Sequence, residues 1–328
     1  MVEKIKRSLE RNLRSRGGTT GMKYLSVCSG IEAATVAWHP LGWKPIAFSE
    51  IEPFSRSVLT HHYPEVPMHG DFTTIKEHDY GRPDLLVGGT PCQSFSVAGL
   101  RRGFADDRGN LTLEFARLAQ RLQPEWIVWE NVPGVLSIDR GRAFGNLLGA
   151  LAELGYGYAY RVLDAQYVRT CRHPRAVPQR RRRVFVVGHL GDWRRAAAVL
   201  FDTESLRGNP APSRKTAKRT ARDVNDRVTG CLLARDYKGV NTFDIEEGKY
   251  VYAIQEEMTI ERNALRRFTP LECERLQGFP DNYTLVPHKE KLAKDSPRYK
   301  ALGNSMAVNV MEWLGERIEK ITKTKQKG

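Results

Sequence analysis

The sequence predicts an α/β protein with an open, mainly parallel β-sheet and a second, smaller domain of irregular and β structure. Short apolar strands alternate with longer segments of helical spacing, which is the pattern of a parallel sheet. They are interrupted by a stretch rich in Arg, Lys, Ser and Pro that leads into short β-favouring segments. The sequence therefore divides into a basic arm (1–22), a main domain in two pieces (23–192 and 265–322), a smaller domain (193–264) and a tail (323–328).

Strand, turn, helix and strand open the main domain. A strand at 24–28 and a helix at 31–38 are joined by a turn at Gly30. A second strand at 45–49 ends in the acid Glu50. This order is the start of a β-α-β unit with parallel strands.

Two further strands end in polar or reactive residues. The strand at 84–87 runs into a Gly- and Pro-rich loop that contains Cys92, and the strand at 126–129 ends at Glu130. The carboxyl ends of parallel strands meet at one edge of the sheet, where ligands bind in such folds. Glu50, Cys92 and Glu130 are therefore expected to converge on one site.

Helices are predicted from spacing and from capping residues. Apolar residues recur at helical spacing over 111–122. Thr269, followed by Pro270 and Glu272, predicts a capped helix start, and Gly278 predicts its end. A last helix at 307–320 needs its apolar face buried, which consists of Val308, Met311, Leu314 and Ile318.

The composition is that of a basic protein without membrane segments. The formal net charge of +14 favours an acidic polymer such as nucleic acid as partner. No apolar run approaches the roughly 20 residues of a membrane-spanning helix, and the basic N-terminus lacks the apolar stretch of a secretory signal. The five cysteines contain no C-x-x-C pair, so neither a disulfide framework nor a bound metal is expected. We expect a cytoplasmic protein that binds no membrane.

Three kinds of side chain could carry chemistry at the predicted sheet edge. A lone cysteine is usually a buried small apolar residue, but the loop position of Cys92 favours a nucleophilic thiolate. Glu130 either caps a helix or pairs with an arginine, or donates a proton beside Cys92. The arginines at 180–183 form either a solvated charge run or a strand whose Arg181 and Arg183 share one face.

The turn after the first strand suits a nucleotide-type cofactor. Gly30 permits a tight turn, and Glu50 could accept hydrogen bonds from ribose hydroxyls. The turn does not contain G-x-G-x-x-G, so its spacing alone leaves a dinucleotide, S-adenosylmethionine or no cofactor open.

Five short motifs follow one another along the chain. They are Gly89-Thr90-Pro91-Cys92-Gln93-Ser94-Phe95-Ser96, Glu130-Asn131-Val132-Pro133-Gly134, Gln179 to Arg183, Arg275-Leu276-Gln277-Gly278-Phe279-Pro280 and Gly303-Asn304-Ser305. In this order they resemble the motifs of the cytosine-5 DNA methyltransferases of bacterial and phage type. The resemblance implies a Rossmann-like domain that depends on S-adenosylmethionine, with a target recognition domain at 193–264. It also implies a cytoplasmic enzyme of a bacterial or phage-infected cell.

The resemblance implies covalent catalysis on a cytosine ring. Cys92 is then the nucleophile that adds to the 6-position and so activates the 5-position for methylation. Glu130 would protonate or hydrogen-bond ring N3, which requires a raised pKa. Arg183, with Arg181 in support, would hold the carbonyl oxygen of the base. The base that finally removes the 5-proton is not identified by the sequence.

The resemblance also assigns residues to the S-adenosylmethionine site. They are Cys28, Ser29, Gly30, Ile31, Glu50, Ile51, Asp71, Phe72, Pro91, Leu111, Asn304 and Ser305. Two positions depart from the family pattern, because Cys28 stands where an aromatic residue is usual and Glu32 where a second glycine is usual. These departures concern how the cofactor packs.

Double-stranded DNA is the implied substrate, and a short sequence in it would be recognised. Chemistry on a base inside a duplex requires that the base be flipped out. The implied DNA contacts are Gln93, Ser96, Arg101 and Arg102 after the nucleophile, and Arg235, Tyr237 and Lys238 in the smaller domain. Each of the last three could instead be an ordinary surface residue.

Two other functions stay open at this stage. One is a transfer-RNA cytosine-5 methyltransferase, and the other is a catalytically silent DNA-binding repressor. The basic smaller domain favours DNA, and the intact Cys92 and Glu130 favour catalysis. A monomer is expected. The resemblance to enzymes of restriction-modification systems leaves open whether a cognate endonuclease is encoded separately, since this sequence contains no nuclease motif.

Overall fold

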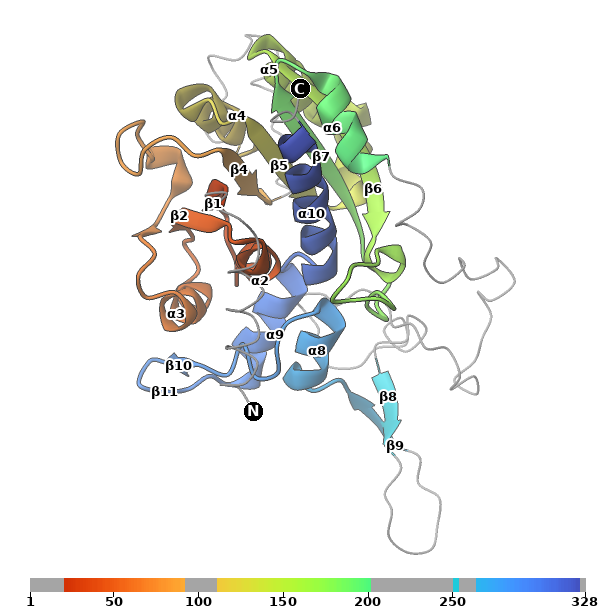
Figure 1. Ribbon diagram of the computed structural model, residues 1–328. Coiled ribbons are helices and arrows are strands. Elements are labelled where there is room, and N and C mark those ends of the chain that lie inside the picture. Colours follow the sequence, from red (N-terminus) through yellow and green to blue (C-terminus); the bar gives the residue numbers. More distant parts are fainter. Residues whose placement is uncertain (1–20, 92–110, 202–249, 254–263, 325–328) are drawn as a thin grey trace, which may run out of the picture.

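A seven-stranded sheet forms the centre of the computed structural model, which describes residues 21–91, 111–201, 250–253 and 264–324 (Figure 1). The order of the strands is β3-β2-β1-β4-β5-β7-β6. Their bounds are β1 Lys23–Val27, β2 Lys44–Ser49, β3 Met68–His69, β4 Leu85–Gly88, β5 Trp126–Asn131, β6 Tyr156–Asp164 and β7 Arg182–Leu190.

Most of the sheet is parallel, as the sequence predicts. The five strands β1 to β5 pair in parallel with their neighbours. β7 is antiparallel to both β5 and β6, so β6 runs in the same direction as β5. The carboxyl ends of β1, β2, β4, β5 and β6 therefore lie at one edge of the sheet, where β7 begins.

Helices cover both faces of the sheet. They are α2 Ala33–Trp38, α3 Pro53–His62, α4 Leu111–Leu122, α5 Arg142–Glu153, α6 Trp193–Leu200, α8 Pro270–Gln277, α9 Asp295–Asn304 and α10 Val308–Thr324. Along β5, Trp126 and Val128 join the core cluster that contains α2, α6 and α10. Ile127 and Trp129 join the second cluster with α4 and α5. Alternate residues of β5 therefore face opposite sides of the sheet, and each side is covered by helices. The main domain thus has three layers, with the sheet in the middle.

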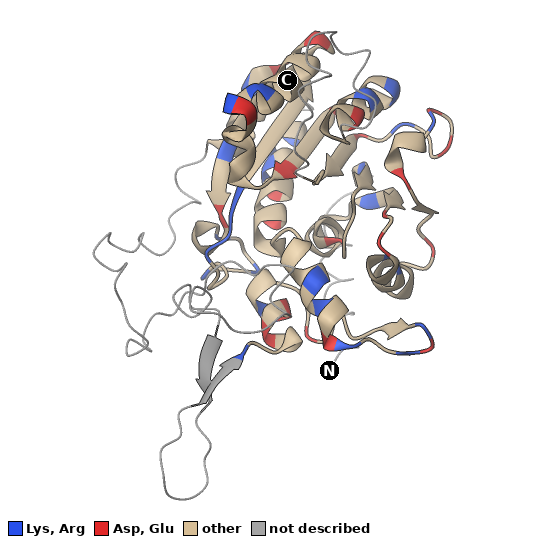
Figure 2. Cartoon of the chain, turned by 180° about the vertical axis from the view of Figure 1, so that it is seen from behind, with Lys and Arg blue, Asp and Glu red and all other residues tan. Residues whose placement is uncertain are grey.

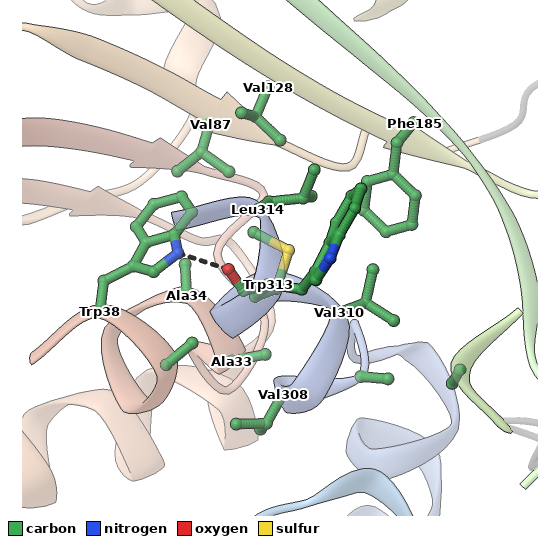
Figure 3. Close-up of a cluster of buried hydrophobic side chains, with 14 of the residues drawn as sticks. Ala33, Ala34, Trp38, Val87, Val128, Phe185, Val308, Val310, Trp313 and Leu314 are labelled. Atoms are coloured by element: carbon green, nitrogen blue, oxygen red, sulfur yellow. Dashed lines mark hydrogen bonds between the residues drawn. The ribbon is translucent and has the colours of Figure 1, made fainter. Parts of the chain in front are cut away.

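The contact between α2 and α10 fixes the helix that follows β1. The indole Nε1 of Trp38 donates a hydrogen bond of 2.7 Å to the carbonyl of Met311 (Figure 3). A Cβ at Gly315 would lie 2.4 Å from Cδ1 of Trp38, so only a glycine permits this close approach. α10 thus anchors the C-terminal end of α2, the helix that follows the β1–α2 turn.

Two helices match the sequence predictions at the level of their caps and faces. Thr269 and Glu272 form a reciprocal capping box at the start of α8, and Gly278 ends it with φ of 82°. In α10 the four predicted residues are fully buried: Val308, Met311, Leu314 and Ile318.

The predicted boundary at residue 193 differs from the observed packing. α6 begins at Trp193, yet its Ala196, Val199 and Leu200 are completely buried in the same cluster as α10. Three buried apolar side chains at helical spacing belong to the main core, so α6 is part of the main domain.

Two small hairpins complete the described structure. β8 (Tyr250–Ala253) lies inside the range predicted as the smaller domain and pairs antiparallel with β9 (Ala264–Arg267), which begins at the last residue of that range. β10 (Pro287–His288) pairs with β11 (Lys291–Leu292) before α9. Among the described residues, every helix is too short or too polar to cross a membrane.

Candidate active site

A pocket lies where the carboxyl ends of β1, β4 and β5 meet the segment between α9 and α10. Its lining consists of Ser26, Val27, Cys28, Ser29, Gly30, Glu32, Ala33, Ala34, Val87, Gly89, Glu130, Asn304, Ser305 and Met306. Residues from the first turn, from the end of β5 and from the C-terminal part of the chain therefore share one site, which agrees with the predicted sheet edge.

The β1–α2 turn is tight and open towards the pocket. Gly30 has φ of +57°, and apart from Gly30 and its two chain neighbours no described heavy atom lies within 4 Å of a Cβ built on it. Its amide donates to Oε2 of Glu50 at 2.7 Å. The other oxygen of Glu50 accepts from the amides of Ile51 and Glu52, both at 2.8 Å. Three amides thus fix the orientation of this carboxylate.

Burial raises the pKa of Glu50 although the three amide hydrogen bonds act in the opposite direction. A carboxylate has about four lone-pair sites, so three bonds leave room for another donor. The open space beside Gly30 and this oriented acid fit a nucleoside-bearing cofactor such as S-adenosylmethionine.

Cys28 lies in the same turn with φ of 50°. Burial, followed by the charges of Glu50 and Asp71, raises the pKa of its thiol to about 12. A thiol with this pKa stays protonated near neutral pH and is a poor nucleophile. Cys28 therefore lines the pocket without acting as a nucleophile.

Glu130 and Arg183 form an ion pair between neighbouring strands. Nε of Arg183 lies 3.0 Å from Oε1 of Glu130, and both side chains are largely buried. Burial raises the pKa of Glu130, while the positive charges of Arg183 and Arg181 oppose that shift. The carboxyl therefore holds its proton to a higher pH than an exposed glutamate, as a proton donor requires.

Arg181 has a different place from Arg183. Its side chain is 2% exposed, and its guanidinium donates to the carbonyls of Gly303 at 3.0 Å and Ser305 at 2.6 Å. It thus ties the start of β7 to the turn between α9 and α10. This turn carries Asn304 and Ser305, which line the pocket.

A hydrogen-bonded strand end precedes the predicted nucleophile. Nδ2 of Asn131 donates to the carbonyl of Thr90, and the indole of Trp129 donates to its hydroxyl, both at 3.0 Å. A Cβ at Gly89 would lie 2.9 Å from Oε2 of Glu130, so the backbone passes directly beside this carboxyl.

The structure brings together only part of the predicted cofactor set. Cys28, Ser29, Gly30, Asn304 and Ser305 line the pocket, and Glu50 contacts it through Gly30. The pocket lining does not include Ile31, Ile51, Asp71, Phe72, Pro91 and Leu111. Of these, Phe72 is buried in the cluster with α4, whereas Ile51 is 70% exposed.

Several predicted residues lie outside the described part of the chain. They are Cys92, Gln93, Ser96, Arg101, Arg102, Arg235, Tyr237 and Lys238. Their roles stay predictions.

Sequence reasoning did not assign Glu32 to the site. It is the N-cap of α2, with φ of 61°, and its carboxylate accepts hydrogen bonds from Ser26 and from the amide and hydroxyl of Thr35. Burial raises the pKa of Glu32, against the effect of these hydrogen bonds. The signal in the sequence was the acid at a position where glycine is usual.

Comparison with known proteins identifies the family. The sequence profile of the C-5 cytosine-specific DNA methylases matches residues 22–232 and 211–320. The chain is 33% identical to a protein of Escherichia phage P1 named DNA N-6-adenine-methyltransferase, in an alignment 475 positions long. This alignment covers 93% of this chain and 62% of that protein. It is 29% identical to the type II methyltransferase M2.BsuMI of Bacillus subtilis, covering 90% of this chain and 75% of that one.

A solved structure agrees on the fold. A DNMT2 protein of Spodoptera frugiperda superposes with a TM-score of 0.66 at 18% identity, covering 91% of this chain and all of that one. Members of the family use S-adenosylmethionine as methyl donor, and the geometry around Gly30 and Glu50 fits that cofactor. The profile match over most of the chain, with the matching fold, shows that this chain belongs to the C-5 cytosine-specific DNA methylases.

Proposed function

We propose that this protein methylates the 5-position of cytosine within a short recognition sequence of double-stranded DNA. The observation that carries the proposal is that one pocket joins Glu130 to the turn at Gly30 and to Ser305. A base held at Glu130 and a methyl donor held at Gly30 would then be neighbours, as direct transfer requires. Membership of the family supports the same reaction.

Each proposed catalytic residue has a distinct task. Cys92 forms a bond from its sulfur to the 6-position of a cytosine flipped out of the duplex, which makes the 5-position nucleophilic. Glu130 supplies a proton or hydrogen bond to ring N3 as negative charge accumulates there. S-adenosylmethionine supplies the methyl group as an electrophile. Loss of the 5-proton then lets the sulfur of Cys92 leave.

The described strand end supports the role of Cys92. Gly89 passes directly beside the carboxyl of Glu130, and Cys92 follows three residues later. Three residues span at most about 10 Å, so the chain after Gly89 is long enough for the thiol of Cys92 to reach a base held at Glu130.

A second candidate, methylation of the adenine amino group, is suggested by the name of the phage P1 relative. The chain spans 62% of the length of that relative, so its activity does not transfer directly. An amino nitrogen carries its own lone pair, whereas the 5-position of cytosine needs covalent activation. The proposed addition of Cys92 to the ring provides that activation, which favours cytosine.

Recognition of the DNA sequence is proposed for the predicted smaller domain, residues 193–264. Arg235, Tyr237 and Lys238 are proposed to contact the DNA there, and Gln93, Ser96, Arg101 and Arg102 beside the nucleophile. We further propose that the protein acts as a monomer in the cytoplasm. A separately encoded endonuclease is a proposal that the type II names of relatives support.

The test is base-resolution bisulfite sequencing of DNA from a host without cytosine methylation of its own. Expression of this protein should protect cytosines in one short motif, and expression of Cys92→Ser should protect none. Soluble wild-type protein that leaves every cytosine convertible would contradict the proposed function.

A further inference from the structure

The segment from Ala165 to Arg183 has an unusual charge composition. It contains seven arginines and no Asp or Glu. Two of them, Arg181 and Arg183, serve the active site as described above. The other five are exposed: Arg169, Arg172, Arg175, Arg180 and Arg182. Figure 2 shows this positive charge in the connection that leads into β7.

The segment is held firmly against the main domain. Asn309 on α10 donates to the carbonyls of Ala165 at 2.9 Å and Val168 at 2.8 Å. Gln179, completely buried, donates to the carbonyl of Leu276 on α8 at 3.0 Å. The exposed arginines therefore project from a fixed backbone, which lowers the entropy cost of binding.

Arg172, in the middle of the segment, has a structural role, because its guanidinium has partners within the protein. Its guanidinium pairs with Glu312 at 2.8 Å and donates to the carbonyl of Ala37, also at 2.8 Å, at the end of α2. Thr170 and His173 donate to the same carboxylate. Hydrogen bonds to Glu312 thus fasten the middle of the segment to α10 and α2.

The other four exposed arginines of the segment lack such partners within the described part of the chain. Two exposed arginines elsewhere do have such partners, since Arg142 pairs with Asp139 and Arg275 with Asp281. In contrast, no ion pair joins Arg169, Arg175, Arg180 or Arg182 to a described acid. Four like charges on one fixed segment repel one another and favour a polyanionic partner.

The position of the segment points to the same partner as the active site. β6 ends at the sheet edge where β5 ends, and the segment connects β6 to β7 at that edge. Register pairs place Arg182 opposite Asp164 and Arg183 opposite Leu163. Arg182 is therefore one residue from the arginine that pairs with Glu130.

We propose that Arg169, Arg175, Arg180 and Arg182 bind the phosphates of the DNA duplex that presents its base to Glu130. This inference rests on the proposed function, because it takes the substrate to be DNA. Phosphate contacts fix the register of a protein on DNA without reading its sequence. The arginines would hold the duplex at the sheet edge while the target base enters the pocket.

The test measures how salt changes the binding of duplex DNA of arbitrary sequence. Two double variants each remove one pair of charges, Arg169→Gln with Arg175→Gln, and Arg180→Gln with Arg182→Gln. The matched control, Lys44→Gln with Arg194→Gln, removes two exposed charges at the start of β2 and after β7, at the opposite edge of the sheet.

Each arginine that neutralises one phosphate contributes about −0.9 to the slope of log affinity against log salt. Each test variant should therefore flatten the slope by about 1.8 and weaken binding roughly 10- to 60-fold near 0.1 M salt. The control should keep the wild-type slope. For the Arg169 and Arg175 variant, the rate at saturating DNA and the affinity for S-adenosylmethionine should change less than twofold.

Slopes equal to that of wild type in both test variants would overturn the inference. Weaker binding of folded RNA with unchanged binding of duplex DNA would overturn it as well. DNA methylation by the wild-type protein is measured in parallel. If methylation is present and the slopes do not change, only the phosphate surface is wrong. If the wild-type protein methylates no DNA, the proposed function fails first.

Discussion

At the scale of single residues, the pocket contains two carboxyl groups, those of Glu130 and Glu32, whose pKa values are raised by burial. Glu130 forms an ion pair with Arg183, and Glu32 accepts hydrogen bonds from the hydroxyls of Ser26 and Thr35. The sequence identified Glu130 and Arg183 through their motifs and their strand positions. It did not identify Glu32, because a side chain that folds back onto the preceding strand leaves no periodic signal.

The Glu130→Gln variant should lose catalysis and keep cofactor binding. The amide preserves the shape of the side chain but cannot deliver a proton, which typically costs a factor of about 10² to 10⁴ in rate. The affinity for S-adenosylmethionine should change less than threefold. Single-turnover kinetics and cofactor titration measure the two effects, with Glu125→Gln as control, since Glu125 pairs with His189 near the opposite end of β5.

The direction of the pKa shift gives the pH dependence of this step. Burial raises the pKa of Glu130, so the proton is available below the raised value and is lost as the pH rises through it. The single-turnover rate should therefore fall on the alkaline side. An unchanged rate in Glu130→Gln would contradict the assignment as proton donor.

Glu32 should make the folded protein less stable as the pH rises. Burial raises its pKa in the folded state, so ionisation costs more there than in the unfolded chain, whose pKa is about 4.3. The contribution to stability is largest below the unfolded pKa and declines as the pH rises through the folded pKa. Glu32→Gln removes this decline, and denaturant unfolding at several pH values measures it. Exposed Glu65 provides the control, Glu65→Gln. Parallel curves for wild type and Glu32→Gln would refute this account.

At the scale of elements, capping and periodicity predicted α8 and α10, because these signals are local. No pattern in the sequence predicted α3, α5 and β6. α5 contains Gly145 and Gly149, which weaken the helical signal. The antiparallel direction of β7 follows from pairing with β5 and β6, and no local pattern contains that information.

The contact between α2 and α10 should tolerate no additional methyl group. Gly315→Ala would place a Cβ 2.4 Å from the ring of Trp38, and such overpacking typically costs about 1–3 kcal/mol. Gly149→Ala on α5 meets open space and should stabilise the protein by about 0.5–1 kcal/mol. Denaturant unfolding compares the two. Gly315→Ala should also weaken cofactor binding, since Trp38 ends the helix after the pocket turn. Equal stabilisation by both variants would contradict the close contact.

At the scale of the whole molecule, alternating strands and helices predicted the sheet and its functional edge. The first piece of the main domain was predicted to end at residue 192, although α6, which follows, packs in the main core. The sequence of α6 is basic, and only three of its residues are buried apolar ones, so its helical pattern is weak. The net charge of +14 indicated a nucleic-acid partner but not its location. The fold places those exposed arginines of the β6–β7 connection that have no acidic partner among the described residues at the edge that also carries Glu130.

The central claim is that Cys92 activates cytosine for methylation of its 5-position. The most direct measurement is nucleoside mass spectrometry of duplex DNA after incubation with the purified protein and S-adenosylmethionine. The account predicts 5-methylcytosine with the wild-type protein and none with Cys92→Ser. N6-methyladenine as the product, or 5-methylcytosine formed equally well by Cys92→Ser, would contradict it.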